Sequence, residues 1–355
     1  WVFYLVWQME RVFGAYVGWN SMPDFPYATA QVRGVWVGLL LFALWIGRRH
    51  LFGIARKVLG KGKDLDDSRE PLGYRTAALG ILLGMGFIVS FCVKMGMSAW
   101  VAFVFFLIYF ALSTTLTRIR AELGPPAHDM YGSGPDHIMT MFLGTRRLGA
   151  GNLTIFSLFY WINREAYRTH PMPHQLEAFK LSYQANMNSR RLTYTIILAS
   201  AVGALSCFWA FLHAAYQLGA GDRLYRTTWF ARESYTRLAT WLHYPSTPNH
   251  MEITFSGIGL GFTILMLLMR MRFLWWTLHP VGYAVSGWWI IGRLWFPLFI
   301  SSVIKWLALK FGGAKGYRRA VPFFLGLILG DFIVGSIWSI LGIVLGMRTY
   351  VFWGG

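Results

Sequence analysis

The stretch from Phe323 to Gly346, FFLGLILGDFIVGSIWSILGIVLG, decides the fold class of this chain. Its one charged residue, Asp331, stands among residues that are otherwise apolar or small. A run of about 20 mostly apolar residues is long enough to cross the hydrocarbon core of a bilayer as an α-helix. The stretch therefore predicts a membrane-spanning helix.

Similar apolar runs recur along the chain. They cover Val32–Ile46, Thr76–Lys94, Ala99–Leu116, Leu192–Leu218 and Ile253–Met269. The composition agrees, because only 14% of the 355 residues are charged, whereas a soluble domain usually has about 25%. We therefore predict an all-α, polytopic integral membrane protein with about seven to nine membrane segments, including broken or re-entrant helices.

The net charge of +18 comes from Lys and Arg that lie between the apolar runs. The positive-inside rule and anionic lipids produce this pattern, so we expect the lipid bilayer as partner and no nucleic acid. Residues 48–75 are predicted to be a basic cytoplasmic loop, 118–191 a cytoplasmic-side re-entrant and amphipathic region, and 219–250 an outer loop. The membrane we expect is the cell (inner) membrane of a bacterium or an archaeon.

The start of the chain and its two cysteines give little information about the fold or the site. Because the chain begins at Trp1 within an apolar run, we expect residues 1–355 to be a single transmembrane domain in the C-terminal part of a longer chain. Cys92 and Cys207 both lie in apolar segments. They indicate neither a disulfide framework nor a metal site.

The segment Trp275–Leu309 is apolar but interrupted by Pro280, Gly282 and other helix breakers. Basic residues before and after it both suggest the cytoplasmic side. A hairpin of two short or broken helices that enters and leaves on one side satisfies both, and such backbone is tolerated only beside protein or a water-filled cavity. The break at His279–Gly282 is a candidate substrate site, although an ordinary proline kink explains it equally well.

A second unusual stretch, RIRAELGPPAHDMYGSG, covers Arg118–Gly134. Its double proline stops the preceding helix, and the stretch also contains Glu122, His128 and Asp129. These residues are predicted to line a substrate path as gate or coupling groups in a re-entrant loop, or else to belong to a loop that caps the helix. His128 and Asp129 could join Asp136 and His137 in a mixed metal site, but four solvated loop residues are the preferred interpretation. No metal, cofactor or catalytic residue is expected.

Charged residues inside apolar runs are costly and are functional hypotheses by default. They are Lys94, Arg293, Lys305 and Asp331. Asp331 is the best candidate for a proton-coupling carboxylate, although it could instead form a structural ion pair with Arg293. Lys94 and Lys305 could extend to an interface.

The last hundred residues resemble the oligopeptide transporter superfamily, which includes the yellow-stripe-like carriers. The resemblance rests on four parts in order: HPVGY (279–283), VIKWLALKFGG (303–313), GAKGYRR (313–319) and FFLGLILGDFIVGSIWSILG (323–342). The stretch of residues 170–205 is loosely similar as well, so the resemblance covers about half of the chain. His279 stands where that family would have Asn. The resemblance implies an inverted-repeat carrier with broken helices around a central site, driven by protons.

These observations together predict a secondary transporter of a small polar solute, peptide-like or a metal chelate, coupled to protons and not an enzyme. The expected site residues are Glu122, His128, Asp129, His279, Gly282 and Asp331. One alternative is a non-transporting scaffold subunit of a larger membrane complex or a homo-oligomer. Another is a membrane enzyme that acts on lipid-linked substrates.

Overall fold

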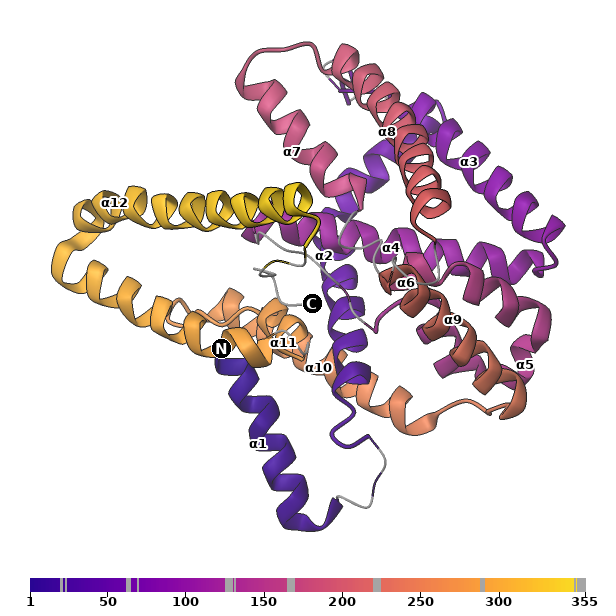
Figure 1. Cartoon of the computed structure of the whole chain (residues 1–355), viewed down its shortest axis with the longest axis horizontal. Helices are drawn as coiled ribbons and strands as arrows, with labels where there is room; N and C mark the ends of the chain where they lie inside the picture. Colours follow the sequence, from indigo (N-terminus) through magenta and orange to yellow (C-terminus); the bar gives the residue numbers. More distant parts are fainter. Residues whose placement is uncertain are drawn as a thin grey trace. The chain divides into compact units, whose positions relative to one another are not determined.

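The computed structural model describes residues 1–355 apart from 20–21, 23, 62–64, 69, 125–129, 131, 165–169, 220–224, 288–290, 348 and 350–355. Every regular element in this part is an α-helix (Figure 1). The helices are α1 (Val2–Val17), α2 (Ala28–Val58), α3 (Tyr74–Lys94), α4 (Ala99–Leu123), α5 (Pro135–Leu158), α6 (Tyr160–Arg164), α7 (Pro171–Gln184), α8 (Ser189–Leu218), α9 (Tyr225–His243), α10 (His250–Arg272), α11 (Pro280–Ser286) and α12 (Ile291–Leu345). They belong to two compact units, Val2–Trp289 and Trp1 with Ile290–Gly355.

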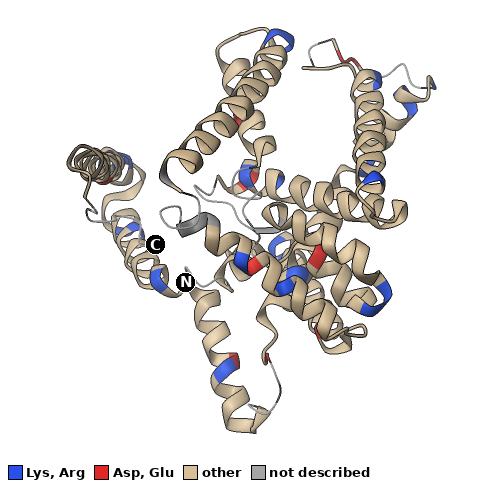
Figure 2. Cartoon of the chain, turned by 45° about the vertical axis from the view of Figure 1, so that its right-hand side comes forward, with Lys and Arg blue, Asp and Glu red and all other residues tan. Residues whose placement is uncertain are grey.

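Six of these helices, α2, α3, α4, α8, α10 and α12, are long and apolar enough to cross a membrane. Each predicted apolar run lies within one of them, apart from the last residue, Gly346, of the final run. Figure 2 shows how little of the ribbon is charged and that basic segments outnumber acidic ones. An all-helical fold with six candidate membrane-spanning helices is therefore confirmed for the described residues, while insertion into a membrane, the number of crossings and their re-entrant character stay predictions.

Helices α2 and α10 form the closest contact in the Val2–Trp289 unit. A Cβ atom built on Gly34 would lie 1.9 Å from the backbone oxygen of Ser256, and one on Gly259 would lie 2.0 Å from that of Gln31. Gly38 faces Thr263 one turn further along both helices. The two helices thus run in parallel, and small residues let their backbones touch, as in other membrane helix pairs.

Helix α5 is interrupted twice. Gly144 and Gly149 have φ of 73° and 78°, which is outside the helical region. Beyond the second break, Asn152 accepts a hydrogen bond from the backbone nitrogen of Ser98 (2.8 Å) and so fixes α5 to the turn between α3 and α4. The two glycines therefore divide α5 into shorter helical segments.

The unit that contains α12 is a helical hairpin. Its two halves run in opposite directions on either side of Gly313, whose φ is 57° (Figure 1). Each half exceeds the length of about 20 residues that a crossing needs. Pro297, which was expected to interrupt the apolar run, lies inside the first half without ending it.

Two of the predicted regions contain helices. The predicted outer loop 219–250 contains the helix α9, because Tyr225–His243 has an amphipathic pattern that packs on α5. Near the end of the predicted amphipathic region 118–191, α7 ends at Gln184 and α8 begins at Ser189. Within Trp275–Leu309, α11 is a helix of seven residues, too short to span a membrane.

Candidate functional site

A polar pocket of about 770 Å³ lies in the Val2–Trp289 unit. It is bordered by α2, α5 and α9, by the first turn of α10 and by the loop that leads into α10. Its polar lining includes Arg33, His137, Thr140, Thr145, Arg237 and Glu252, and its apolar lining includes Met141, Trp241, Pro245, Pro248 and Met251. It is therefore the place where buried charges of three helices meet.

The first charged pair is Arg33 with Glu252. Because α2 and α10 are parallel, their N-terminal ends lie together and bring these two residues into contact. Glu252 is fixed by the helix cap, since its backbone nitrogen donates to Asn249 Oδ1 (3.2 Å) and its Oε1 accepts from Asn249 Nδ2 (3.0 Å). Arg33 also donates from Nε to the carbonyl oxygen of Gly132 (2.8 Å), and its side chain is only 8% exposed.

The second pair is Asp136 with Arg237. Asp136 is completely buried in the first turn of α5, where a negative charge also complements the helix dipole. The guanidinium carbon of Arg237 lies 4.4 Å from the ring centroid of Trp241 and 4.9 Å from that of Tyr160. Burial, followed by the positive charge of Arg33, lowers the pKa of Arg237 to about 10. Arg237 therefore stays charged at neutral pH, and the two guanidinium groups are close enough to repel each other.

His137 completes this cluster. Its Nε2 lies 3.1 Å from Nη1 of Arg237. A guanidinium group can only donate, so His137 accepts at Nε2 and its proton is on Nδ1. In this arrangement His137 is an uncharged acceptor that helps to hold Arg237 in place.

The loop before α10 closes over the break in α5. The backbone nitrogen of Ser246 donates to Thr145 Oγ1 (2.8 Å), and that of Asn249 donates to the carbonyl oxygen of Met141 (3.0 Å). A Cβ on Gly144 would lie 2.6 Å from the Ser246 oxygen, so only glycine fits there. Residues 118–191 and 219–250 were predicted on opposite sides of the membrane. Since they are hydrogen-bonded here, either α5 reaches the outer surface as a re-entrant segment or one of the two assignments is wrong.

The structure brings together two of the predicted site residues. His279 Nε2 lies 3.8 Å from Glu122 Oε1, although the two were predicted from separate motifs. His279 also caps α11, because its Nδ1 accepts a hydrogen bond from the backbone nitrogen of Val281 (3.1 Å). Gly282 has a packing role, since a Cβ there would lie 2.8 Å from the ring of Phe3. None of the three lines the polar pocket.

The remaining predicted residues fall elsewhere. His128 and Asp129 lie outside the described residues. Asp331 is in the second half of α12, half-exposed, and forms no ion pair with another described residue. Within the described part of the chain no cluster of His, Cys, Asp and Glu could hold a metal ion, and Asp136 and His137 are both engaged by Arg237.

Arg33, Glu252 and Arg237 were not identified from the sequence. Arg33 and Glu252 stand at the beginnings of two apolar runs, where a charged residue usually marks the membrane interface. Arg237 lies in a polar stretch that contains several other charges. The one available signal was the position of Arg33, which is a charged residue inside the apolar run Val32–Ile46, as Asp331 is inside Phe323–Gly346.

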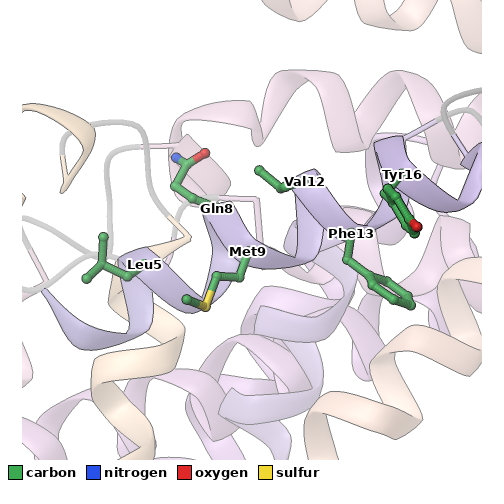
Figure 3. Close-up of a pocket in the computed structure, with 6 residues that line it drawn as sticks. All are labelled: Leu5, Gln8, Met9, Val12, Phe13 and Tyr16. Carbon is green, nitrogen blue, oxygen red and sulfur yellow. The ribbon is translucent and has the colours of Figure 1, made fainter.

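A second pocket, of about 470 Å³, runs along one face of α1 (Figure 3). Leu5, Met9, Val12 and Tyr16 recur at helical spacing along it, and Gln8 is its one amide side chain. It contains no charged residue, so it is an apolar helix face and provides no chemistry.

Comparison with known proteins places the chain in one family. It belongs to a family of unknown function (DUF6785), whose model matches residues 1–354. No curated protein and no solved structure matches the chain.

Proposed function

We propose that this protein is a secondary membrane transporter of a small polar solute, coupled to protons, and that the polar pocket is its solute site. The observation that carries the proposal is the presence of two partly buried ion pairs at a pocket of about 770 Å³. Small-molecule sites usually have volumes of about 300–1,000 Å³. Ionisable groups inside a membrane protein are costly and usually mark a path for a polar substrate or ion.

The broken helices support the same proposal. The interruption of α5 at Gly144 lies directly at the pocket, where the loop of residues 245–249 covers it. Interrupted helices around a central site are typical of secondary transporters, and the resemblance to the oligopeptide transporter superfamily implies the same design. In this proposal Glu122 and His279 act at a gate, and Asp331 is the proton-coupling carboxylate. The solute is peptide-like or a metal chelate if that resemblance extends to the substrate.

Uptake by proteoliposomes tests the proposal. Labelled di- and tripeptides and metal chelates are offered to vesicles that contain the protein, with and without a proton gradient. The expected result is uptake that depends on the gradient and disappears when Arg237→Gln and Asp136→Asn are combined. Absence of uptake of every solute by correctly folded protein would contradict transport.

A non-transporting scaffold is the second candidate, and the exposure of α8 and α12 favours it. The most apolar part of each has no residue buried within the chain, although lipid alone could cover these surfaces. A scaffold subunit would be purified in a mild detergent as a defined complex with other chains. A transporter would be purified alone or as a homo-oligomer and would still take up solute.

A further inference from the structure

The charges that line the polar pocket are unbalanced. Arg33, Arg237 and Glu252 are its charged lining residues, whereas Asp136, the carboxylate partner of Arg237, is completely buried and does not line it. His137 is neutral in this arrangement, as its contact with Arg237 shows. A solute in the pocket therefore directly meets two guanidinium groups and one carboxylate, while the second carboxylate, that of Asp136, contacts Arg237 outside the lining. The guanidinium donors in the lining favour a ligand group that accepts hydrogen bonds.

Arg33 has hydrogen-bonding capacity left. Its Nε donates to the oxygen of Gly132, and its Nη1 contacts Glu252 and the sulfur of Met141. Its Nη2 has no hydrogen-bond partner among the described residues and is not enclosed by protein, although the side chain as a whole is more than nine-tenths buried. This single unpartnered nitrogen of a pocket-lining arginine can donate a charge-assisted hydrogen bond to one oxygen of a carboxylate.

Arg237 can offer only Nη1 to a ligand, because its Nε and Nη2 are enclosed by protein, and Nη1 also contacts His137. Its ring contacts with Trp241 and Tyr160 and its ion pair with Asp136 fix the guanidinium plane beside the pocket. An anion placed between Arg33 and Arg237 would relieve the repulsion between the two positive charges. A neutral or cationic ligand would leave that repulsion in place.

The rest of the lining is apolar. Met141, Trp241, Pro245, Pro248 and Met251 form it. A small ion such as acetate would leave most of the volume of about 770 Å³ unfilled. A ligand with an apolar body would bury that surface and gain from the hydrophobic effect.

We infer that the pocket binds an organic carboxylate with an apolar body. The carboxylate group bridges Arg33 and Arg237. The apolar body packs against the side of the pocket formed by Trp241, Pro245 and Pro248. This inference rests on the proposed function only for the claim that the ligand is then transported. Binding itself is expected whether or not transport follows.

Equilibrium binding of radiolabelled benzoate to the full chain in lipid nanodiscs tests the inference, with empty nanodiscs correcting for benzoate in lipid. Unlabelled benzoate should displace the label. Acetate, which has the same head group without the body, should be at least about tenfold weaker, which corresponds to about 1.4 kcal/mol. Benzylamine, with the same body and the opposite charge, and inorganic phosphate should not compete. No saturable benzoate binding, or equal competition by benzylamine, would overturn the inference.

Paired substitutions locate the site without leaving a buried charge alone. Arg33→Gln with Glu252→Gln, and Arg237→Gln with Asp136→Asn, should each weaken benzoate binding by at least about tenfold. Arg232→Gln is the matched control, because Arg232 is an exposed residue of the same helix α9 and does not line the pocket. If a paired variant does not fold, Arg33→Lys keeps the charge but removes the planar fork and should still weaken binding. Unchanged binding by all folded variants would place benzoate elsewhere.

Uptake measured on the same preparations separates the two proposals. Benzoate binding without uptake of any solute would contradict transport and leave the carboxylate site standing. Uptake of another solute by protein that does not bind benzoate would contradict the carboxylate site and leave transport standing.

Discussion

The helix pair α2–α10 and the hairpin of α12 use similar apolar sequences in opposite ways. In the pair, glycines sit where a neighbouring backbone leaves no room for a Cβ, and the charge of Arg33 is matched by Glu252. In α12, a Cβ atom built on Gly326 or Gly330 would meet no described atom within 4 Å beyond the adjoining backbone of its own helix, and Asp331 has no ionic partner among the described residues.

This difference separates two roles. The pair is specified by contacts inside the chain, so its small and charged residues determine how the helices fit together. The residues of α12 meet little of their own unit and are left for lipid or another chain. Single substitutions should therefore disturb the fold in the first region and leave it intact in the second.

The largest effect on stability is expected for Gly34→Ala. The new methyl group would overlap the Ser256 oxygen at 1.9 Å, so the two backbones must separate; overpacking of this kind costs about 1–3 kcal/mol or more. Gly326→Ala is the matched control, because the site is open and alanine favours helix by about 0.5–1 kcal/mol. Thermal unfolding in detergent should show a lower Tm for the first variant and an equal or higher Tm for the second. Equal Tm values would mean that α2 and α10 do not touch at Gly34.

A smaller, pH-dependent effect is expected for Glu10→Gln. Glu10 accepts hydrogen bonds from Gln31 Nε2 and from the hydroxyl of Tyr283 (both 3.3 Å), where α1, α2 and α11 meet. Burial raises the pKa of Glu10 and outweighs these hydrogen bonds, which lower it. The folded state thus binds the proton more tightly than the unfolded state does, so the contribution to stability is complete below the ordinary pKa of glutamate and is lost as pH rises through the raised value.

Glu10→Gln should remove this dependence, and the variant should be more stable than the unaltered protein at neutral pH, where a buried carboxylate is charged. Tm measured as a function of pH above the ordinary pKa of glutamate checks this. The burial of Tyr283, followed by the charge of Glu10, raises the pKa of Tyr283, so its hydroxyl remains a donor throughout. If the Tm of the unaltered protein instead rose with pH above the ordinary pKa of glutamate, folding would lower the pKa of Glu10, which would contradict the prediction.

Asp331→Asn should leave the fold unchanged and remove the function. The side chain is half-exposed and has no ionic partner among the described residues, so the amide costs little stability. If Asp331 carries the coupled proton, gradient-dependent uptake disappears while expression and Tm are retained. Unchanged uptake would show that Asp331 does not carry the coupled proton, and the titratable groups of the polar pocket would then be the candidates for proton coupling.

The spans could be predicted from the sequence because long apolar runs are a local property. Thr76–Lys94 was predicted and Tyr74–Lys94 is observed, and the other spans differ mainly by polar residues that extend their ends. A helix within a polar segment, such as α9, was missed because its stability comes from packing on α5 rather than from its own composition.

The site could not be predicted in the same way. Asp136 and Arg237 are far apart in the sequence. Asp136 was noted only as a possible metal ligand, and its pairing with Arg237 follows only from the packing of α5 and α9. Glu122 and His279 were each identified as unusual, and their proximity followed only from the fold. Sequence reasoning found charged residues that were out of place in apolar runs, but it could not find charges that are buried by their partners.

The smallest perturbation tests how the two regions are arranged across the membrane. Lys61 follows α2 and Arg318 follows the turn of α12, and both lie in basic stretches that the positive-inside rule assigns to the cytoplasm. Single cysteines at these positions, in a background in which Cys92 and Cys207 are replaced by alanine, should react with an impermeant maleimide from the same side. They should change neither Tm nor uptake relative to that cysteine-free background. Labelling from one side requires an even number of crossings between them, which the predicted hairpin in Trp275–Leu309 supplies. Labelling from opposite sides would contradict the predicted hairpin. Helix α11 would then be a short helix that packs on α1 and α2 without forming part of a membrane loop.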